Sequence, residues 1–210
     1  MERNQTIIVA VIVGLAIVMV AVGTMSTASQ LDIDTQQSAT FLAASLPNHK
    51  TIVSSPITPD VFNTWFSECS TIGFKEGYLA EYLVYNATTS SLEPYTSSQP
   101  FLVTLTISEF STESLAQKFS ACRLDNLGKE QSAGTITSST PEIIETIGDE
   151  SRAETFTLLP KTQEAEFSGA MILTRTQNIV YTVSVIPYLP GGALQDATML
   201  AKQIGQQIGA

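Results

Sequence analysis

The sequence predicts an α+β fold: an antiparallel sheet of about four to five strands with three helices, preceded by one N-terminal transmembrane helix. Three patterns predict it, namely a long apolar segment at the N-terminus, stretches of alternating apolar and polar residues, and helical apolar spacing on either side of them. The strand-like stretches follow one another rather than alternating with helices. This order favours antiparallel hairpins over parallel crossover units.

The N-terminal apolar segment predicts a membrane anchor. Residues 7–23 form a run of 17 residues without charge, amide or hydroxyl, and 11 of them are Ile, Leu or Val. A helix over residues 6–25 is about 30 Å long, enough to cross the hydrocarbon core. Arg3 precedes the run and the next basic residue is Lys50, so we expect residues 1–5 in the cytoplasm. The alternative is a long secretory signal sequence, with residues 1–28 cleaved.

The rest of the chain predicts a stalk and one domain. Residues 26–40 are polar without a sustained period, as expected of a stalk. Residues 41–210 suffice for one packed α+β domain and hardly for two. With 20 acidic against 10 basic residues, the chain carries a net charge of −10 and would repel phosphate, which excludes a nucleic-acid partner. We therefore expect a single-pass membrane protein whose domain is extracytoplasmic.

Local signals place the elements of the domain. Thr58-Pro59-Asp60 combines a hydroxyl N-cap, a proline and an acid, a typical helix start. The stretches 170–176 and 179–186 alternate and are separated by two residues, which predicts a hairpin. The expected elements are a helix after Thr58, strands at 74–85 and 101–108 joined by a polar loop, a helix from 111 or 112 to about 128, a strand near 154–159, the hairpin, and a helix at 194–208.

The two cysteines predict a disulfide. Cys69 and Cys122 both follow the span, in a compartment that we expect to be oxidising, and each ends the apolar face of a short helix. The alternative is a pair of buried free thiols. Neither cysteine has the Cys-x-x-Cys or Cys/His spacing of a metal site, so we expect no metal and no cofactor.

The sequence contains no recognisable catalytic motif, which predicts that the chain is not an enzyme. His49 is the sole histidine and is expected in a solvated turn, and no nucleophile elbow, zinc-protease motif or phosphate loop occurs. Asp149 and Glu150 are adjacent acids in a Gly-Asp-Glu-Ser turn, where a structural role is expected. Asn86 begins a glycosylation sequon, meaningful where the host glycosylates extracytoplasmic asparagine.

Short motifs in residues 101–208 carry a family resemblance. They are the alternating strand that begins at Phe101, the helix with Leu115-Ala116-Gln117-Lys118-Phe119, the turn Ile147-Gly148-Asp149-Glu150-Ser151, the Arg175-centred hairpin, and the helix with Leu200-Ala201-Lys202-Gln203-Ile204. In this order they resemble the extracytoplasmic sensor-like domains of bacterial serine/threonine kinases and related cell-envelope proteins. The resemblance implies an α+β domain with a groove beside its sheet and a ligand-sensing or binding role without catalysis. Five residues precede Thr6, so we expect no cytoplasmic kinase.

Three functional hypotheses follow. The first is a membrane-anchored, extracytoplasmic, non-catalytic domain, held in the membrane by residues 6–25, that binds an envelope ligand or a partner protein. The second is an accessory subunit of a larger membrane complex, and the third is a secreted enzyme of unknown class. We expect the soluble domain to be monomeric, because its apolar strand faces have helices to cover them. The ligand-binding residues are not identified by the sequence.

Overall fold

The computed structural model describes residues 33–46, 48–69, 73–84, 101–126, 134–160, 166–187 and 192–208. Their elements, in order, are α2 (Ile33–Ser45), β1 (His49–Ile57), α3 (Pro59–Trp65), the 3-10 turn η1 (Ser67–Cys69), β2 (Phe74–Val84), β3 (Phe101–Phe110), α4 (Glu113–Asn126), β4 (Gly134–Glu142), β5 (Glu150–Pro160), β6 (Phe167–Thr176), β7 (Ile179–Pro187) and α5 (Ala193–Ile208). The predicted span at residues 6–25 and the sequon at Asn86 lie outside the described residues. None of the described helices is long and apolar enough to cross a membrane.

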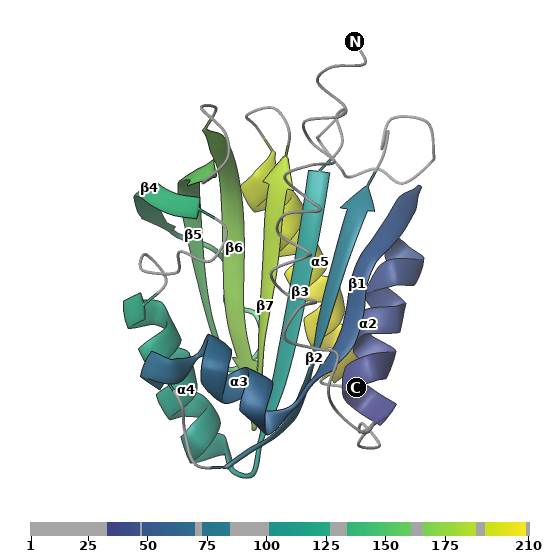
Figure 1. Cartoon of the computed structure of the whole chain (residues 1–210), viewed down its shortest axis with the longest axis vertical. Helices are drawn as coiled ribbons and strands as arrows, with labels where there is room; N and C mark the ends of the chain where they lie inside the picture. Colours follow the sequence, from purple (N-terminus) through teal and green to yellow (C-terminus); the bar gives the residue numbers. More distant parts are fainter. Residues whose placement is uncertain are drawn as a thin grey trace.

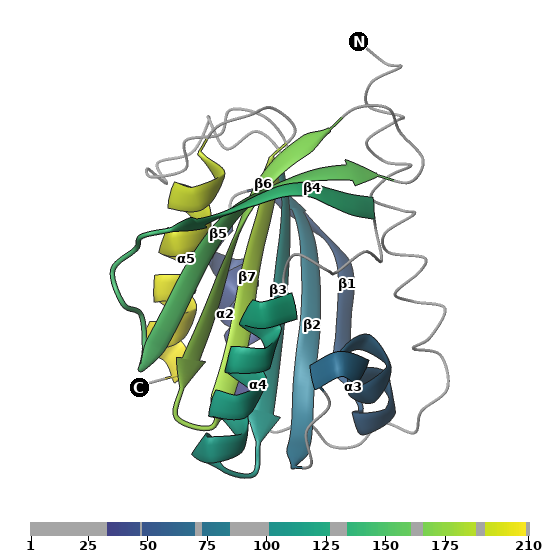
Figure 2. The same ribbon diagram turned by 90° about the vertical axis from the view of Figure 1, so that its left-hand side faces the viewer.

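The strands form one antiparallel sheet of seven strands in the order β1-β2-β3-β7-β6-β5-β4. Helices α2 and α5 pack on one face, and α3, η1 and α4 cover part of the other face (Figures 1 and 2). The predicted α+β class with an antiparallel sheet is therefore confirmed. The predicted number of elements is wrong, because the described residues form seven strands and four α-helices.

The strands missing from the prediction are the two edges of the sheet, β1 and β4. Each contains a proline, Pro56 in β1 and Pro141 in β4, and each is rich in Ser and Thr. An edge strand has one side that needs no ladder partner, so it tolerates proline, which donates no backbone hydrogen bond. The features that suit these segments to an edge also hide them from a search for alternating patterns.

Helix α2 corrects the predicted stalk. It begins at Ile33, so residues 33–40 of the range assigned to the stalk belong to the domain. Ala39 and Leu42 are buried against the sheet, and the Tyr82 hydroxyl donates to the Ala39 carbonyl at 3.0 Å. The helix is anchored by a few small and apolar contacts rather than by a continuous apolar stripe, which explains why its sequence appears featureless.

Two apolar cores lie on opposite faces of the sheet. The core under α2 and α5 includes Leu42, Val103, Tyr181, Leu200 and Ile204. The core under α3, η1 and α4 is aromatic and includes Phe62, Phe110 and Phe119. The Thr58 side chain caps α3 by accepting a hydrogen bond from the Val61 amide at 3.4 Å, as predicted. Both faces of the central strands are thus buried, which fixes their register.

The Cys69–Cys122 disulfide predicted from the sequence is present. It joins η1 to α4, with Cα atoms 5.6 Å apart, within the usual range for a disulfide. It closes the aromatic core at its outer side, where both cysteines pack with Phe66 and Phe119. The bond therefore ties together the two short elements that cover this face.

Candidate functional site

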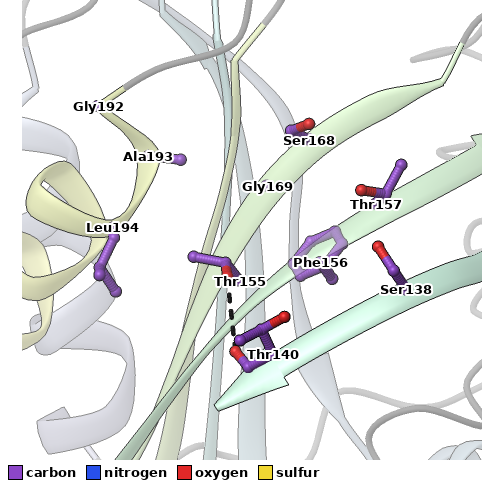
Figure 3. Close-up of a pocket in the computed structure, with 10 residues that line it drawn as sticks. All are labelled: Ser138, Thr140, Thr155, Phe156, Thr157, Ser168, Gly169, Gly192, Ala193 and Leu194. Carbon is purple, nitrogen blue, oxygen red and sulfur yellow. Dashed lines mark hydrogen bonds between the residues drawn. The ribbon is translucent and has the colours of Figure 1, made fainter. Parts of the chain in front are cut away.

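A pocket lined by hydroxyl groups lies between strands β4, β5 and β6 and the first turn of α5 (Figure 3). Register places its side chains in two rows across the strands, Ser138–Thr157–Ser168 and Thr140–Thr155–Ala170. These residues share the face on which α5 packs, because Ala170 belongs to the core beneath that helix. The strands extend past the start of α5, so the apolar face gives way to hydroxyls where the helix no longer covers it.

The pocket has a volume of about 340 Å³, at the lower end of the range for small-molecule sites. The Thr155 hydroxyl has two acceptors, the Glu142 carboxylate at 2.8 Å and the Thr140 carbonyl at 3.5 Å. Within the described part of the chain, the other four hydroxyls, those of Ser138, Thr140, Thr157 and Ser168, make no hydrogen bond to protein. They therefore face solvent with their donors and acceptors available to a ligand.

Gly192 and Gly169 also line the pocket. Gly192 adopts a φ of 76°, in the left-handed region that favours glycine, and its carbonyl accepts the Asp196 amide at 3.0 Å to start α5. At Gly169 an added Cβ would meet the ring of Phe156 from the neighbouring strand. Gly192 thus allows the backbone turn that starts α5, and Gly169 leaves room for the Phe156 ring.

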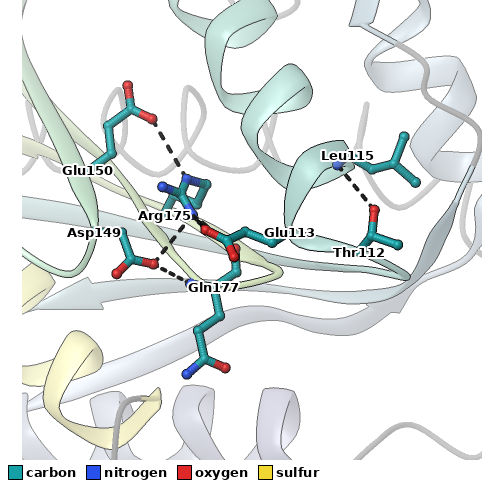
Figure 4. Close-up of polar contacts among 7 residues, drawn as sticks. All are labelled: Thr112, Glu113, Leu115, Asp149, Glu150, Arg175 and Gln177. Carbon is teal, nitrogen blue, oxygen red and sulfur yellow. Dashed lines mark hydrogen bonds and ion pairs between the residues drawn. The ribbon is translucent and has the colours of Figure 1, made fainter.

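The adjacent acids Asp149 and Glu150 belong to a structural cluster around Arg175, at the end of the sheet that carries the β6–β7 turn (Figure 4). The Arg175 side chain is 9% exposed and lies 3.0 Å from Glu113, 3.3 Å from Asp149 and 3.7 Å from Glu150. Asp149 also accepts the Gln177 amide at 2.6 Å. These contacts hold α4, the connection before β5 and the hairpin together, in agreement with the structural role expected for both acids.

The cluster also explains the hairpin turn, whose Gln-Asn sequence is a weak turn former. Gln177 has a φ of 52°, and its strained conformation is stabilised by Asp149 and by its carbonyl, which accepts from Arg175 at 3.2 Å. Asn178 donates to the Phe110 carbonyl at 2.8 Å. Gly148 is required beside this turn, because its φ is 66° and a side chain there would collide with Thr176.

Glu81 is a buried carboxylate that sequence analysis missed. It lies in β2 opposite Val53 and Thr104, on the face of the aromatic core, and it is 2% exposed. No ion pair or hydrogen bond from its side chain is found within the described part of the chain. Burial raises the pKa of Glu81 from 4.5 to about 7, because the charged form loses its hydration.

His49 does not occupy a solvated turn as predicted. It is the first residue of β1 and is half-buried, with its ring edge-on to Tyr82 at 5.6 Å and its Nδ1 3.3 Å from the Leu46 carbonyl. These contacts join the end of α2 to the sheet. Among the described residues, no group of three or more acids, histidines and cysteines is placed to hold a metal ion.

No protein-family model matches the sequence, and no curated protein matches it. The solved structures that are similar to the chain include two mycobacterial proteins. The extracellular domain of PknH from Mycobacterium tuberculosis is 13% identical, with a TM-score of 0.46 over 84% of this chain and 92% of that one. An uncharacterized protein from Mycobacterium smegmatis, an Rv0999 ortholog, is 10% identical, with a TM-score of 0.48 over 85% of this chain and 99% of that one.

Proposed function

We propose that this chain is a membrane-anchored, extracytoplasmic, sensor-like domain that binds a ligand and performs no chemistry on it. The observation that carries the proposal is the hydroxyl-lined pocket, in which four hydroxyls that make no hydrogen bond within the described part of the chain surround a volume suited to a small molecule. None of the described residues that line this pocket is an acid, a base or a cysteine. Such a lining can hold a ligand but offers no nucleophile–base pair.

The position of the pocket in the fold supports this role. Helix α2 begins at the end of the sheet that carries the β6–β7 turn, whereas the pocket lies towards the opposite end, beside the start of α5 (Figure 1). If residues 6–25 span the membrane, seven residues connect the span to Ile33, a reach of at most about 25 Å. The pocket then points away from the membrane. The Cys69–Cys122 disulfide fits an oxidising, extracytoplasmic location.

A fragment screen on the full chain tests the proposal. Ligand-observed NMR of the detergent-solubilised protein compares the wild type with Ser168→Phe, which places a phenyl ring in the pocket at an exposed position. We expect hydrophilic fragments that bind the wild type and lose binding in Ser168→Phe, while both proteins unfold at the same temperature. A screen without hits, or hits that bind both proteins equally, contradicts the proposal.

One further observation favours the second hypothesis, an accessory subunit. The Ile143 side chain is fully exposed, at 101% of its reference area. The next residue, Ile144, lines a cavity of about 480 Å³ along α5 together with Leu194, Met199 and polar side chains. A subunit should copurify with stoichiometric partners after mild detergent extraction, and Ile143→Asp should release them. Recovery of the wild-type chain without partners would exclude this role.

A further inference from the structure

The spacing of the pocket hydroxyls defines a two-dimensional array. Adjacent strands lie about 4.8 Å apart, and successive residues on one face of a strand lie about 7 Å apart. Ser138, Thr157 and Ser168 therefore form one row across three strands, and Thr140 and Thr155 form a second row beside it. An array of this size meets a ring-sized ligand at several points at once, rather than at a single group.

The hydroxyls of the array favour ligand groups that can both donate and accept hydrogen bonds. Each Ser or Thr hydroxyl offers one donor and two acceptor positions, and four of the five are uncommitted within the described part of the chain. Ligand hydroxyls and amides complement such groups in either direction. A carboxylate or phosphate can only accept, and an ammonium group can only donate, so each uses only the donors or only the acceptors of the array.

Charge around the pocket disfavours anions. Among the described residues, the lining contains no cation, and the Glu142 carboxylate stands at its edge, where it accepts a hydrogen bond from the Thr155 hydroxyl at 2.8 Å. An anionic ligand would approach this carboxylate without a compensating positive charge from the described residues. The apolar part of the lining, Ala193 and Leu194, offers contact to C–H groups.

We propose that the pocket binds a neutral, polyhydroxylated ligand, a glycosyl unit without a charged group. The inference rests on the proposed function, because it names the ligand class of the same pocket. Hydroxyls on one side of the sugar pair with the array, and its C–H groups pack on Ala193 and Leu194. The same chemistry is presented by free oligosaccharides and by glycan polymers, so the experiment distinguishes these two sources.

The test uses the full chain in a polyoxyethylene-ether detergent, which has no sugar headgroup to compete. Ligand-observed NMR titrations compare two neutral disaccharides, cellobiose and diacetylchitobiose, with cellobiouronic acid, which carries a carboxylate. We expect at least one neutral disaccharide to bind and the uronate to bind much more weakly. Cosedimentation with cellulose and chitin then shows whether the source is a polymer chain or a free sugar, and either result supports the inference.

Substitutions of pocket hydroxyls test whether the sugar binds in this pocket. Thr157→Val and Ser168→Ala each remove one hydroxyl from the array and should weaken binding about fivefold, and the pair about 25-fold. The matched control is Thr137→Val, on strand β4, whose hydroxyl bonds to the Thr157 carbonyl and Glu166 and does not line the pocket. The control should bind like the wild type.

Three results would overturn the inference: neither neutral disaccharide binds, the uronate binds as tightly as they do, or the double variant keeps wild-type affinity. If fragments still bind the pocket and lose binding in Ser168→Phe while no sugar binds, the ligand-binding function stands and the sugar assignment falls. If no fragment binds the pocket either, both the ligand-binding function and the sugar assignment are contradicted.

Discussion

The buried carboxylate of Glu81 makes the stability of the domain depend on pH in an unusual direction. Its pKa rises from 4.5 to about 7 on folding, so the folded state holds a proton that the unfolded state releases between these values. Below pH 4.5 both states are protonated, and the stabilising effect of the bound proton is complete. As the pH rises through 7 that effect is lost, because Glu81 is then charged in both states and the folded state buries the charge.

The size of the effect follows from the shift. A rise from 4.5 to about 7 corresponds to about 3 kcal/mol of unfolding free energy, because each pKa unit is worth about 1.4 kcal/mol. Glu81→Gln keeps the shape and removes the charge. We expect the variant to match the wild type within about 1 kcal/mol at pH 4.5 and to exceed it by about 3 kcal/mol at pH 8.

The assay is guanidinium unfolding followed by the fluorescence of Trp65, the sole tryptophan, which packs against the aromatic core. Measurements at pH 4.5, 6, 7 and 8 give the difference between variant and wild type, in which the titration of all other groups cancels. Glu68→Gln, an exposed change of the same charge, is the control and should show no growing difference. A Glu81→Gln difference that stays constant from pH 4.5 to pH 8 would refute the reasoning.

Three more predictions concern stability. Removing the disulfide with Cys69→Ser and Cys122→Ser should lower the unfolding free energy by about 4 kcal/mol in guanidinium titrations, and a loss below about 1 kcal/mol would contradict the role assigned to it. Arg175→Ala should lower the unfolding free energy by about 2 kcal/mol in the same assay. This is less than the loss expected for a fully buried ion pair, because the three carboxylates around Arg175 are partly exposed. An unchanged unfolding free energy would show that the cluster is dispensable. A soluble chain starting at Phe41 should melt lower than one starting at Gln30 in thermal unfolding, since it lacks most of α2, and equal midpoints would remove α2 from the core.

The central strands could be predicted from the sequence, and the edges could not. β3 and the β6–β7 hairpin are marked by runs of alternating apolar and polar residues, although both faces of β3 and β6 are largely buried. β1 and β4 lack such runs because few of their residues are buried, and their prolines argue against a strand until their edge position is known. Helix α2 was missed because its helical face is only weakly apolar.

Some of the site residues could also be predicted from the sequence, and others could not. The disulfide was predictable because two cysteines in a compartment expected to be oxidising leave one possible pair. Glu81 left a readable signal, since it stands between Leu79 and Leu83 at the period of a buried strand face. The pocket was not predictable, because Ser138, Thr157 and Ser168 converge only through the pairing of three strands.

Labelling in intact cells tests the central claim, that the pocket belongs to an extracytoplasmic domain. The native cysteines form a disulfide, so Ser138→Cys gives the full chain one reactive thiol at the pocket. We predict that a membrane-impermeant maleimide labels this variant in intact cells or right-side-out spheroplasts, while Asn4→Cys is labelled only after permeabilisation. Labelling of Ser138→Cys only after permeabilisation would place the pocket in the cytoplasm and contradict the proposed function.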